Sequence, residues 1–340
     1  MSEQNREIDQ QAPEPQHSGR KWLLLAAKLA VIALVVWAVR ATLASALRDL
    51  ADYRWEIHPL LLSAAGVLYL AGLMPAAWFW HRLLASTGQH LAFWPAVRAY
   101  YISQIGKYVP GKAMVLILRT SLVRAARLDT ALVVASIFLE TLSAMATGSL
   151  LALIVIAIAY PKQMVTAHLW SHTELSVPLV VVAAGLFAAT ALPTLPPVLR
   201  MIVRLLGMGR VRPEALEQLE SAGYGVLAAG WGALAVGWVL QALAMWAVVR
   251  GVGAASDLWS DLPLHLAAVA LAVVAGFLAL LPGGLGVREV VLVPLLAPRY
   301  GPGTALVCAV MLRLVTLVAE VIVCVILYAS TLIDNKRSHV

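Results

Sequence analysis

Long stretches of apolar residues, separated by short polar segments, dominate this chain. A helix needs roughly 20 apolar residues to cross a bilayer, and several stretches reach that length. Because the stretches are continuous and do not alternate with polar residues, they predict helices and exclude the strands of a membrane barrel. They occupy residues 22–39, 60–80, 92–109, 128–158, 177–199, 222–249, 264–281, 286–298 and 304–328.

Two of the stretches, 92–109 and 286–298, are short or adjoin a Pro-Gly break, in the segments GKYVPGK at 106–112 and PGGLGVRE at 282–289. Neither segment can be continuous helix, because proline lacks a backbone donor and glycine adds flexibility. Backbone groups freed at membrane depth are tolerated only where protein or a watery cavity surrounds them. Each break therefore predicts the tip of a re-entrant hairpin, at 92–119 and 264–298. The tip residues are Pro110, Gly111, Pro282, Gly283, Gly284 and Gly286.

The distribution of basic residues favours this arrangement, because Lys and Arg concentrate in cytoplasmic loops. If both hairpins return to the side from which they enter, most Lys and Arg fall on one side, including Arg119 and the cluster at 200–212, and Arg299 falls on the other. If 92–119 crossed as one broken helix, the 200–212 cluster would lie outside. The sequence thus predicts an all-α polytopic membrane protein with six full transmembrane helices, two re-entrant hairpins and both termini in the cytoplasm.

The apolar part of the chain also contains a weak internal repeat. The pattern Thr-Ala-Leu-Val-x-Ala at 130–135 recurs at 304–309, and each copy follows a Pro-Gly break. In the predicted topology the two halves enter from opposite faces, which is typical of transporters with discontinuous helices. The predicted divisions are a disordered cytoplasmic tail at 1–20, a transmembrane domain at 21–330 with inverted-repeat halves at 92–158 and 264–328, and a short cytoplasmic tail at 331–340.

Composition excludes most other classes of protein. Hydrophobic residues make up 61% of the chain and charged residues 13%, so too little charge is present to coat a soluble globule. Membrane orientation and anionic lipid explain the net charge of +7 better than nucleic acid does, because no reader motif accompanies it. Cys308 and Cys324 lie in one apolar stretch and predict neither a disulfide nor a metal site. The GxxxxGK spacing at 106–112 lacks the magnesium-binding Ser or Thr of a phosphate-binding loop. We expect no metal, cofactor or nucleic acid.

Lys107 and Lys112 flank the first break. A helix beginning after Gly111 would direct its free N–H groups and its positive dipole end at the same space, which is suited to an anion such as a lipid phosphate. The alternative is that both lysines extend to the membrane interface without binding anything.

Arg288 and Glu289 follow the second break, inside an otherwise apolar hairpin. As sequence neighbours they point to different sides of a helix, so each needs a partner elsewhere or water. Ionisable residues inside a membrane are costly and are candidates for function. The alternative is a structural ion pair that locks the hairpin.

Glu140 and Arg313 lie near the predicted midplane, although their helices enter from opposite faces. A contact between the two is therefore geometrically possible. Thr316 and Glu320 continue the helix face of Arg313, so a polar stripe follows the last helix. The alternative is that these charges only hold helices together.

Four segments resemble the lysylphosphatidylglycerol synthase transmembrane family: QIGKYVPGKAMVLILR at 104–119, FLET at 138–141, LPGGLGVREVVLVPLL at 281–296 and MLRLVTLVAE at 311–320. The resemblance extends from about residue 20 to 330 and implies a flippase-like helical domain that moves or handles lipids between leaflets. The two-part synthases of this family carry a soluble aminoacyl transferase domain after the membrane domain, and this sequence stops at Val340, so we expect no aminoacylation. The implied site residues are Lys107, Pro110, Gly111, Lys112, Glu140, Pro282, Gly283, Gly284, Gly286, Arg288, Glu289 and Arg313.

These observations together predict a lipid translocator of the bacterial inner membrane, not an enzyme. Lys112 and Arg288 would hold a headgroup phosphate, and four charged residues would form a rearranging network: Glu140, Glu289, Arg313 and Glu320. The expected partner is a membrane phospholipid or a lipid-linked substrate, with a lipid-modifying enzyme as a possible second partner. One alternative is a membrane-embedded enzyme that uses a carboxylate as a base. Another is a membrane subunit that serves a separate lipid-modifying enzyme.

Overall fold

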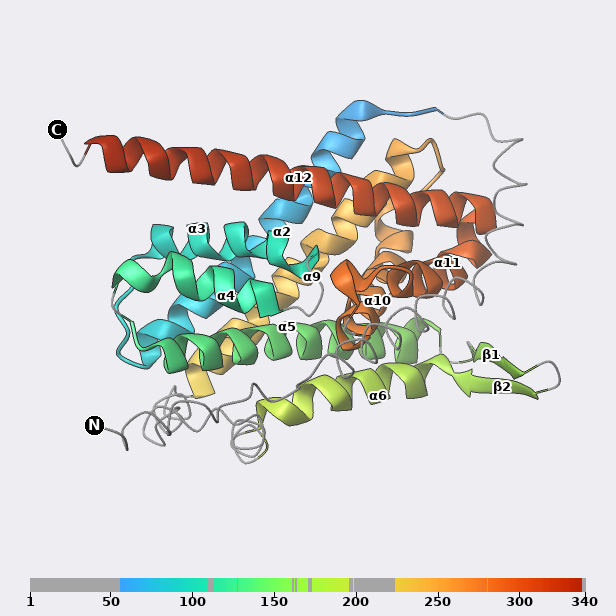
Figure 1. Ribbon diagram of the computed structural model, residues 1–340. Coiled ribbons are helices and arrows are strands. Elements are labelled where there is room, and N and C mark those ends of the chain that lie inside the picture. The colour runs from blue at the N-terminus through green and yellow to red at the C-terminus, as the bar shows by residue number, and fades with distance from the viewer. Residues whose placement is uncertain are drawn as a thin grey trace, which may run out of the picture. The chain divides into compact units, whose positions relative to one another are not determined.

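The protein is almost entirely helical in the computed structural model (Figure 1). The structure describes residues 56–108, 113–126, 128–160, 162, 164–170, 173–195, 198, 224–279 and 281–337. The helices are α2 (Pro59–Ser86), α3 (Phe93–Ser103), α4 (Ala113–Leu122), α5 (Thr130–Ala159), α6 (Leu179–Ala191), α9 (Tyr224–Gly251), α10 (Leu258–Leu278), α11 (Val287–Tyr300) and α12 (Pro302–Arg337). Short 3-10 turns are η1 (Gln104–Tyr108), η2 (Arg124–Ala126), η3 (Leu192–Thr194) and η4 (Pro282–Gly284).

Five of the described helices are long and apolar enough to cross a membrane: α2, α5, α9, α10 and α12. Four of them coincide with predicted spans, which confirms the all-α membrane class. The arrangement differs from the prediction in two places. The 21 residues of α10 were assigned to a hairpin but could span a bilayer, and the apolar helix at Leu179–Thr194 is shorter than the span expected at 177–199. The span predicted at 22–39 and the tail at 1–20 lie outside the described residues.

The only described strands lie between α5 and α6. Here β1 (Met164–Trp170) and β2 (Thr173–Pro178) form an antiparallel pair, with Met164 opposite Pro178. The last helix, α12, continues to Arg337, so its final residues belong to the segment predicted as a short tail from residue 331.

Small residues bring α2 and α9 into close contact along their length (Figure 1). A Cβ atom added at Gly237 of α9 would lie 2.7 Å from the carbonyl oxygen of Gly72 on α2. Such an approach is possible only where neither helix carries a side chain, which is how helices associate without a hydrophobic driving force in lipid. The pair forms a scaffold against which α3, α5, α10 and α12 pack.

Both predicted helix breaks are present, and each separates two helices that pack against each other. In the first, α3 and α4 are neighbours, and a Cβ at Gly106 of η1 would lie 2.6 Å from the backbone nitrogen of Val115. In the second, α10 and α11 are neighbours, and the turn between them contains Gly283, Gly284 and Gly286 with φ of 57°, 68° and 78°. Glycine adopts this left-handed conformation without a steric penalty. The two turns, η1 and η4, also contact each other.

Replacing Gly237 with leucine should force α2 and α9 apart. We expect Gly237→Leu to lower the free energy of unfolding by about 1–3 kcal/mol, the usual range for overpacking. Thermal unfolding in detergent micelles, followed by tryptophan fluorescence, measures the change. Gly232→Leu is the matched control, because a Cβ at Gly232 of the same helix meets nothing within 4 Å. Equal losses in the two variants would contradict close helix contact as the cause.

Candidate functional site

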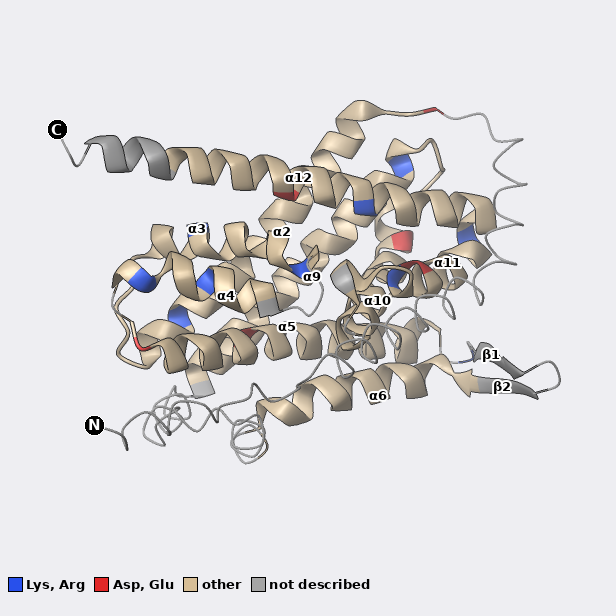
Figure 2. Cartoon of the chain, in the orientation of Figure 1, with Lys and Arg blue, Asp and Glu red and all other residues tan. Residues whose placement is uncertain are grey.

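A cavity of about 480 Å³ lies between the two helix breaks and the helices around them. Its wall is mostly apolar and receives residues from α2, α3, η1, α4, α5, α9, α10, η4, α11 and α12. Charged positions are rare on the described helices (Figure 2), yet several are directed here. The residues singled out from the sequence that line the cavity are Lys107, Glu140, Gly283, Gly284, Arg288, Glu289 and Arg313.

Lys107 of η1 connects three elements at one side of the cavity. Its ammonium group forms an ion pair with Glu320 of α12 and donates a hydrogen bond to the hydroxyl of Tyr69 on α2 at 3.0 Å. Tyr69 in turn donates to the same carboxylate oxygen of Glu320. The side chain of Glu320 is buried, and its second oxygen, Oε2, has no hydrogen-bond partner. Lys107 therefore points into the protein and not toward a membrane interface.

Arg119 and Glu140 form a second, deeply buried pair between α4 and α5. The distance from Nη1 to Oε2 is 3.1 Å, and both side chains are at most 3% exposed. Asp129 caps the first turn of α5 by accepting hydrogen bonds from two backbone amides, so the helix begins at Thr130. The hydroxyl of Tyr100 donates to Glu140 Oε1 at 3.1 Å, and its ring lies 4.1 Å below the guanidinium of Arg119.

This pair corrects one prediction and excludes one contact that the sequence left open. Arg119 was assigned to a cytoplasmic loop, but α4 continues past it to Leu122 and carries it into the interior. The contact considered between Glu140 and Arg313 is not formed, since Glu140 binds Arg119 and Arg313 binds a different carboxylate. Depth in the bilayer is compatible with either partner, and the packing of α4 against α5 decides between them.

Arg313 of α12 binds Glu289 of α11, with 2.7 Å between Nη1 and Oε1. The expectation that Glu289 has a partner elsewhere is thus confirmed. The second carboxylate oxygen of Glu289, Oε2, is buried without a hydrogen-bond partner. A Cβ atom at Gly283 would lie 3.2 Å from Nη2 of Arg313 and 3.0 Å from the ring of Tyr108. At this point the turns of the two helix pairs meet.

Arg288 differs from the other cations at the cavity. Its Nε atom is buried and has no hydrogen-bond partner, and none of the described acidic residues forms an ion pair with it. Two glycines make room for its side chain, because a Cβ at Gly276 would lie 2.9 Å from Arg288 Cγ and one at Gly284 would lie 3.0 Å from Nε. The cavity therefore contains one guanidinium without a carboxylate among the described residues.

The remaining predicted site residues have other positions. Pro282 begins η4, and Gly286 directly precedes the first residue of α11. Glu320 forms an ion pair with Lys107 and does not itself line the cavity. Lys112, Pro110 and Gly111 lie outside the described residues.

Sequence reasoning missed two aromatic residues that hold the acidic groups, Tyr69 and Tyr100. Both stand in apolar stretches where tyrosine is common, so nothing in their spacing distinguishes them. The available signal is chemical, because a buried tyrosine hydroxyl usually finds a hydrogen-bond partner. Arg119 was missed because it ends a short apolar stretch, where a basic residue usually marks the membrane interface.

Comparison with protein families identifies the chain. Residues 25–324 match the model of the family described as "Lysylphosphatidylglycerol synthase TM region". The chain belongs to this family. The match confirms the resemblance recognised in the sequence, and with the five apolar helices it establishes an integral membrane protein linked to lipid modification or transport. A comparison with curated proteins finds no match. The family match includes α2 to α11 and most of α12, and therefore every residue of the cavity.

Removing one charge of the Arg119–Glu140 pair should strongly destabilise the protein. Glu140→Gln leaves the guanidinium of Arg119 buried without compensation, and we expect a loss of about 3–5 kcal/mol in the free energy of unfolding. The double variant Arg119→Met/Glu140→Met removes both charges and should recover most of that loss. Thermal unfolding of the purified variants measures both effects.

A second double-mutant cycle is the control for this pair. Glu140→Gln and Arg313→Gln should be nearly additive, because the two residues have different partners. Strong coupling between Glu140 and Arg313, or no recovery in the methionine double variant, would contradict the pairing described above.

Proposed function

We propose that this protein moves phospholipids between the two leaflets of the membrane by holding the headgroup phosphate on Arg288, without catalysing a chemical reaction. The observation that carries this proposal is the state of Arg288. Its guanidinium lines a largely apolar cavity, with Nε buried and unpartnered, while Lys107, Arg119 and Arg313 each have a carboxylate. A cation in this position is costly unless an anion compensates it.

A phosphodiester is the anion that best suits this group. Guanidinium presents planar donors that match the oxygens of phosphate and forms strong charge-assisted hydrogen bonds with them. Lys112, expected from the sequence to share this task, lies outside the described residues, so Arg288 carries the proposal. The family name links these membrane domains to a lipid synthase, which supports a lipid over a free phosphate.

The size of the cavity favours headgroup binding with the acyl chains left outside. A volume of about 480 Å³ lies within the range of small-molecule sites and is too small for a whole phospholipid. The acyl chains therefore remain in the bilayer while the polar group passes between the helices. The headgroup, whose transfer across the membrane is costly, thus passes through the protein. The acyl chains, whose transfer costs little, stay in the lipid.

The ion pairs supply the elements that move. Lys107–Glu320 and Arg119–Glu140 hold the α3–α4 pair to α12 and α5, and Glu289–Arg313 holds α11 to α12. We propose that a phosphate on Arg288 competes for these partners and shifts the two helix pairs between two arrangements. Discontinuous helices that meet near a central site are typical of such transporters.

In the membrane, we propose that both helix pairs are re-entrant, as an inverted repeat, and that both termini face the cytoplasm of a bacterium. The excess of basic residues on that side supports the orientation. The substrate is a membrane phospholipid or a lipid-linked molecule, and a lipid-modifying enzyme in the same membrane would be its source.

Exchange of fluorescent lipids across proteoliposome membranes tests the proposal. The assay compares phosphatidylglycerol and phosphatidylcholine analogues in vesicles with the wild-type protein, Arg288→Gln and Arg250→Gln. We expect Arg288→Gln to slow exchange by about tenfold or more, because one charge-assisted contact to phosphate contributes about 1.5–3 kcal/mol. Arg250→Gln is the matched control, since Arg250 lies exposed near the end of α9 and away from the cavity.

Two results would refute the proposal in different ways. If wild-type protein exchanges neither lipid faster than protein-free vesicles, translocation of these lipids is excluded. If Arg288→Gln exchanges lipid at the wild-type rate while remaining folded, the phosphate is held elsewhere.

A further inference from the structure

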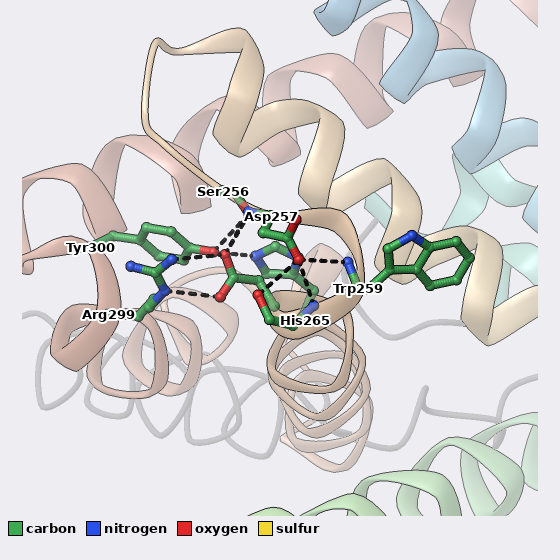
Figure 3. Close-up of polar contacts among 8 residues, drawn as sticks. Ser256, Asp257, Trp259, His265, Arg299 and Tyr300 are labelled. Carbon is green, nitrogen blue, oxygen red and sulfur yellow. Dashed lines mark hydrogen bonds and ion pairs between the residues drawn. The ribbon is translucent and has the colours of Figure 1, made fainter.

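A second polar cluster lies at the other end of the α10–α11 pair, away from the cavity (Figure 3). Asp261, in the first turn of α10, receives two hydrogen bonds from Arg299 near the end of α11: Nε to Oδ1 at 2.8 Å and Nη2 to Oδ2 at 3.2 Å. The Asp261 carboxylate is buried, whereas the Arg299 side chain is 48% exposed. This ion pair clamps the end of α11 to the start of α10.

From this clamp a chain of hydrogen bonds leads inward. The hydroxyl of Ser256 donates to Asp261 Oδ2 at 2.9 Å and lies 3.0 Å from the hydroxyl of Tyr300. The Tyr300 hydroxyl lies 2.9 Å from Nε2 of His265, and the two rings are stacked. Figure 3 shows Ser256, Tyr300 and His265 converging in this way. Carboxylate, hydroxyl and imidazole groups each can give up and accept a proton, so the chain is continuous from the exposed clamp to the imidazole.

Asp257, close to this chain, has a different task. It caps α10 by accepting hydrogen bonds from the backbone nitrogens of Trp259 at 3.1 Å and Ser260 at 2.9 Å, and from the Ser260 hydroxyl. The hydrogen bonds from Ser260 above all hold its pKa below the ordinary value of a carboxyl. Its carboxylate is therefore committed to the helix terminus, and Asp261 alone links the clamp to the inner chain.

His265 has features that a purely structural clamp does not need. Its side chain is completely buried, and Nδ1 has no hydrogen-bond partner. Leaving a polar atom buried without a partner costs free energy. The Asp261–Arg299 pair would join the two helices without it.

We propose that His265 is a proton-binding site, reached from the surface through Asp261, Ser256 and Tyr300, and that its protonation loosens the Asp261–Arg299 clamp. A protonated imidazole places a second cation beside Asp261. The Asp261 carboxylate then interacts with two cations, the His265 imidazolium and the Arg299 guanidinium, so its ion pair with Arg299 weakens. The site gives the transporter a way to use a proton gradient, a role that rests on the lipid translocation proposed above.

The groups that act on His265 come from several elements. Asp261 lies on its own helix, and Arg299 and Tyr300 face it from α11. Tyr160, at the end of α5, interacts electrostatically with Asp261. In the described part of the chain, α6 and α9 contribute apolar side chains such as Ala183 and Val249 to the core around α10 and no titratable group acting on His265.

The clamp is connected to the cavity through the two helices. At the other end of the same pair, Gly276 of α10 packs against the side chain of Arg288 on α11. Gly276 follows His265 by eleven positions on α10, a distance of roughly 16 Å along a helix. Because helices move as rigid bodies, loosening one end of the pair changes how the other end presents Arg288.

The first experiment reads proton binding without any lipid transport. The protein in lipid nanodiscs, with ring-labelled histidine, is titrated from acidic to alkaline pH by NMR, and the His265 signal is assigned by its loss in His265→Gln. We expect His265 to titrate, with a midpoint that rises by about one pH unit in Arg299→Gln, since Asp261 is then free to favour the imidazolium. His81→Gln is the matched control and should not move the midpoint, because His81 binds the Leu91 carbonyl away from this cluster.

The second experiment measures coupling in proteoliposomes. The ratio of lipid exchange rates at pH 4 and pH 7 should be about threefold or more in the wild type and His81→Gln, and close to one in His265→Gln. Tyr300→Phe, which keeps the ring and removes the hydroxyl, should slow the response to a pH jump.

The outcomes separate the two proposals. If His265 shows no titration, or if Arg299→Gln leaves its midpoint unchanged, the proton site is refuted even where lipid exchange is observed. If His265→Gln keeps the wild-type ratio of rates, the coupling is refuted. If no lipid moves but His265 titrates as expected, translocation fails and proton binding stands. Should His265→Gln not fold, the His265 signal is identified as the one whose midpoint moves in Arg299→Gln and not in His81→Gln, and the absence of such a signal refutes the proton site.

Discussion

The compensation of buried charge is the constraint on which this structure depends. Moving an ionised group from water into a low-dielectric interior costs several kcal/mol, and good geometry with additional hydrogen bonds has to offset that cost. The protein meets this requirement with pairs that join separate elements: Lys107–Glu320, Arg119–Glu140 and Arg313–Glu289. The same contacts that neutralise the charges therefore hold the two helix pairs against the spanning helices.

The pairs can form because glycine lets backbone and side chains approach closely. At Gly106 the chain turns back on the start of α4, and this brings Lys107 to α12 and Arg119 to α5. At Gly276 and Gly284 the missing side chains leave the space that Arg288 occupies. A helix pair with larger residues here would be better packed in itself but would displace the guanidinium from the cavity.

The sequence predicts the positions of charged residues far better than it predicts their partners. An ionisable residue inside an apolar stretch is recognisable by itself, so Lys107, Glu140, Arg288, Glu289 and Arg313 were identified, and the Pro-Gly breaks were found for a similarly local reason. Partners depend on the rotation and neighbours of each helix, which depth does not determine. The Arg119–Glu140 pair and the β1–β2 pair were missed for this reason, because both depend on contacts between segments.

The last helix limits how the protein can change shape. Arg313 and Glu320 are seven residues apart on α12, which places them on the same face, and they bind the second and first helix pairs respectively. Neither pair can leave α12 without leaving a buried charge uncompensated, at a cost of about 3–5 kcal/mol. An exchange of partners costs much less, provided that another charge takes the vacated position. An anion bound at Arg288 supplies such a charge beside Glu289, so ligand binding and movement of the helix pairs are expected to occur together.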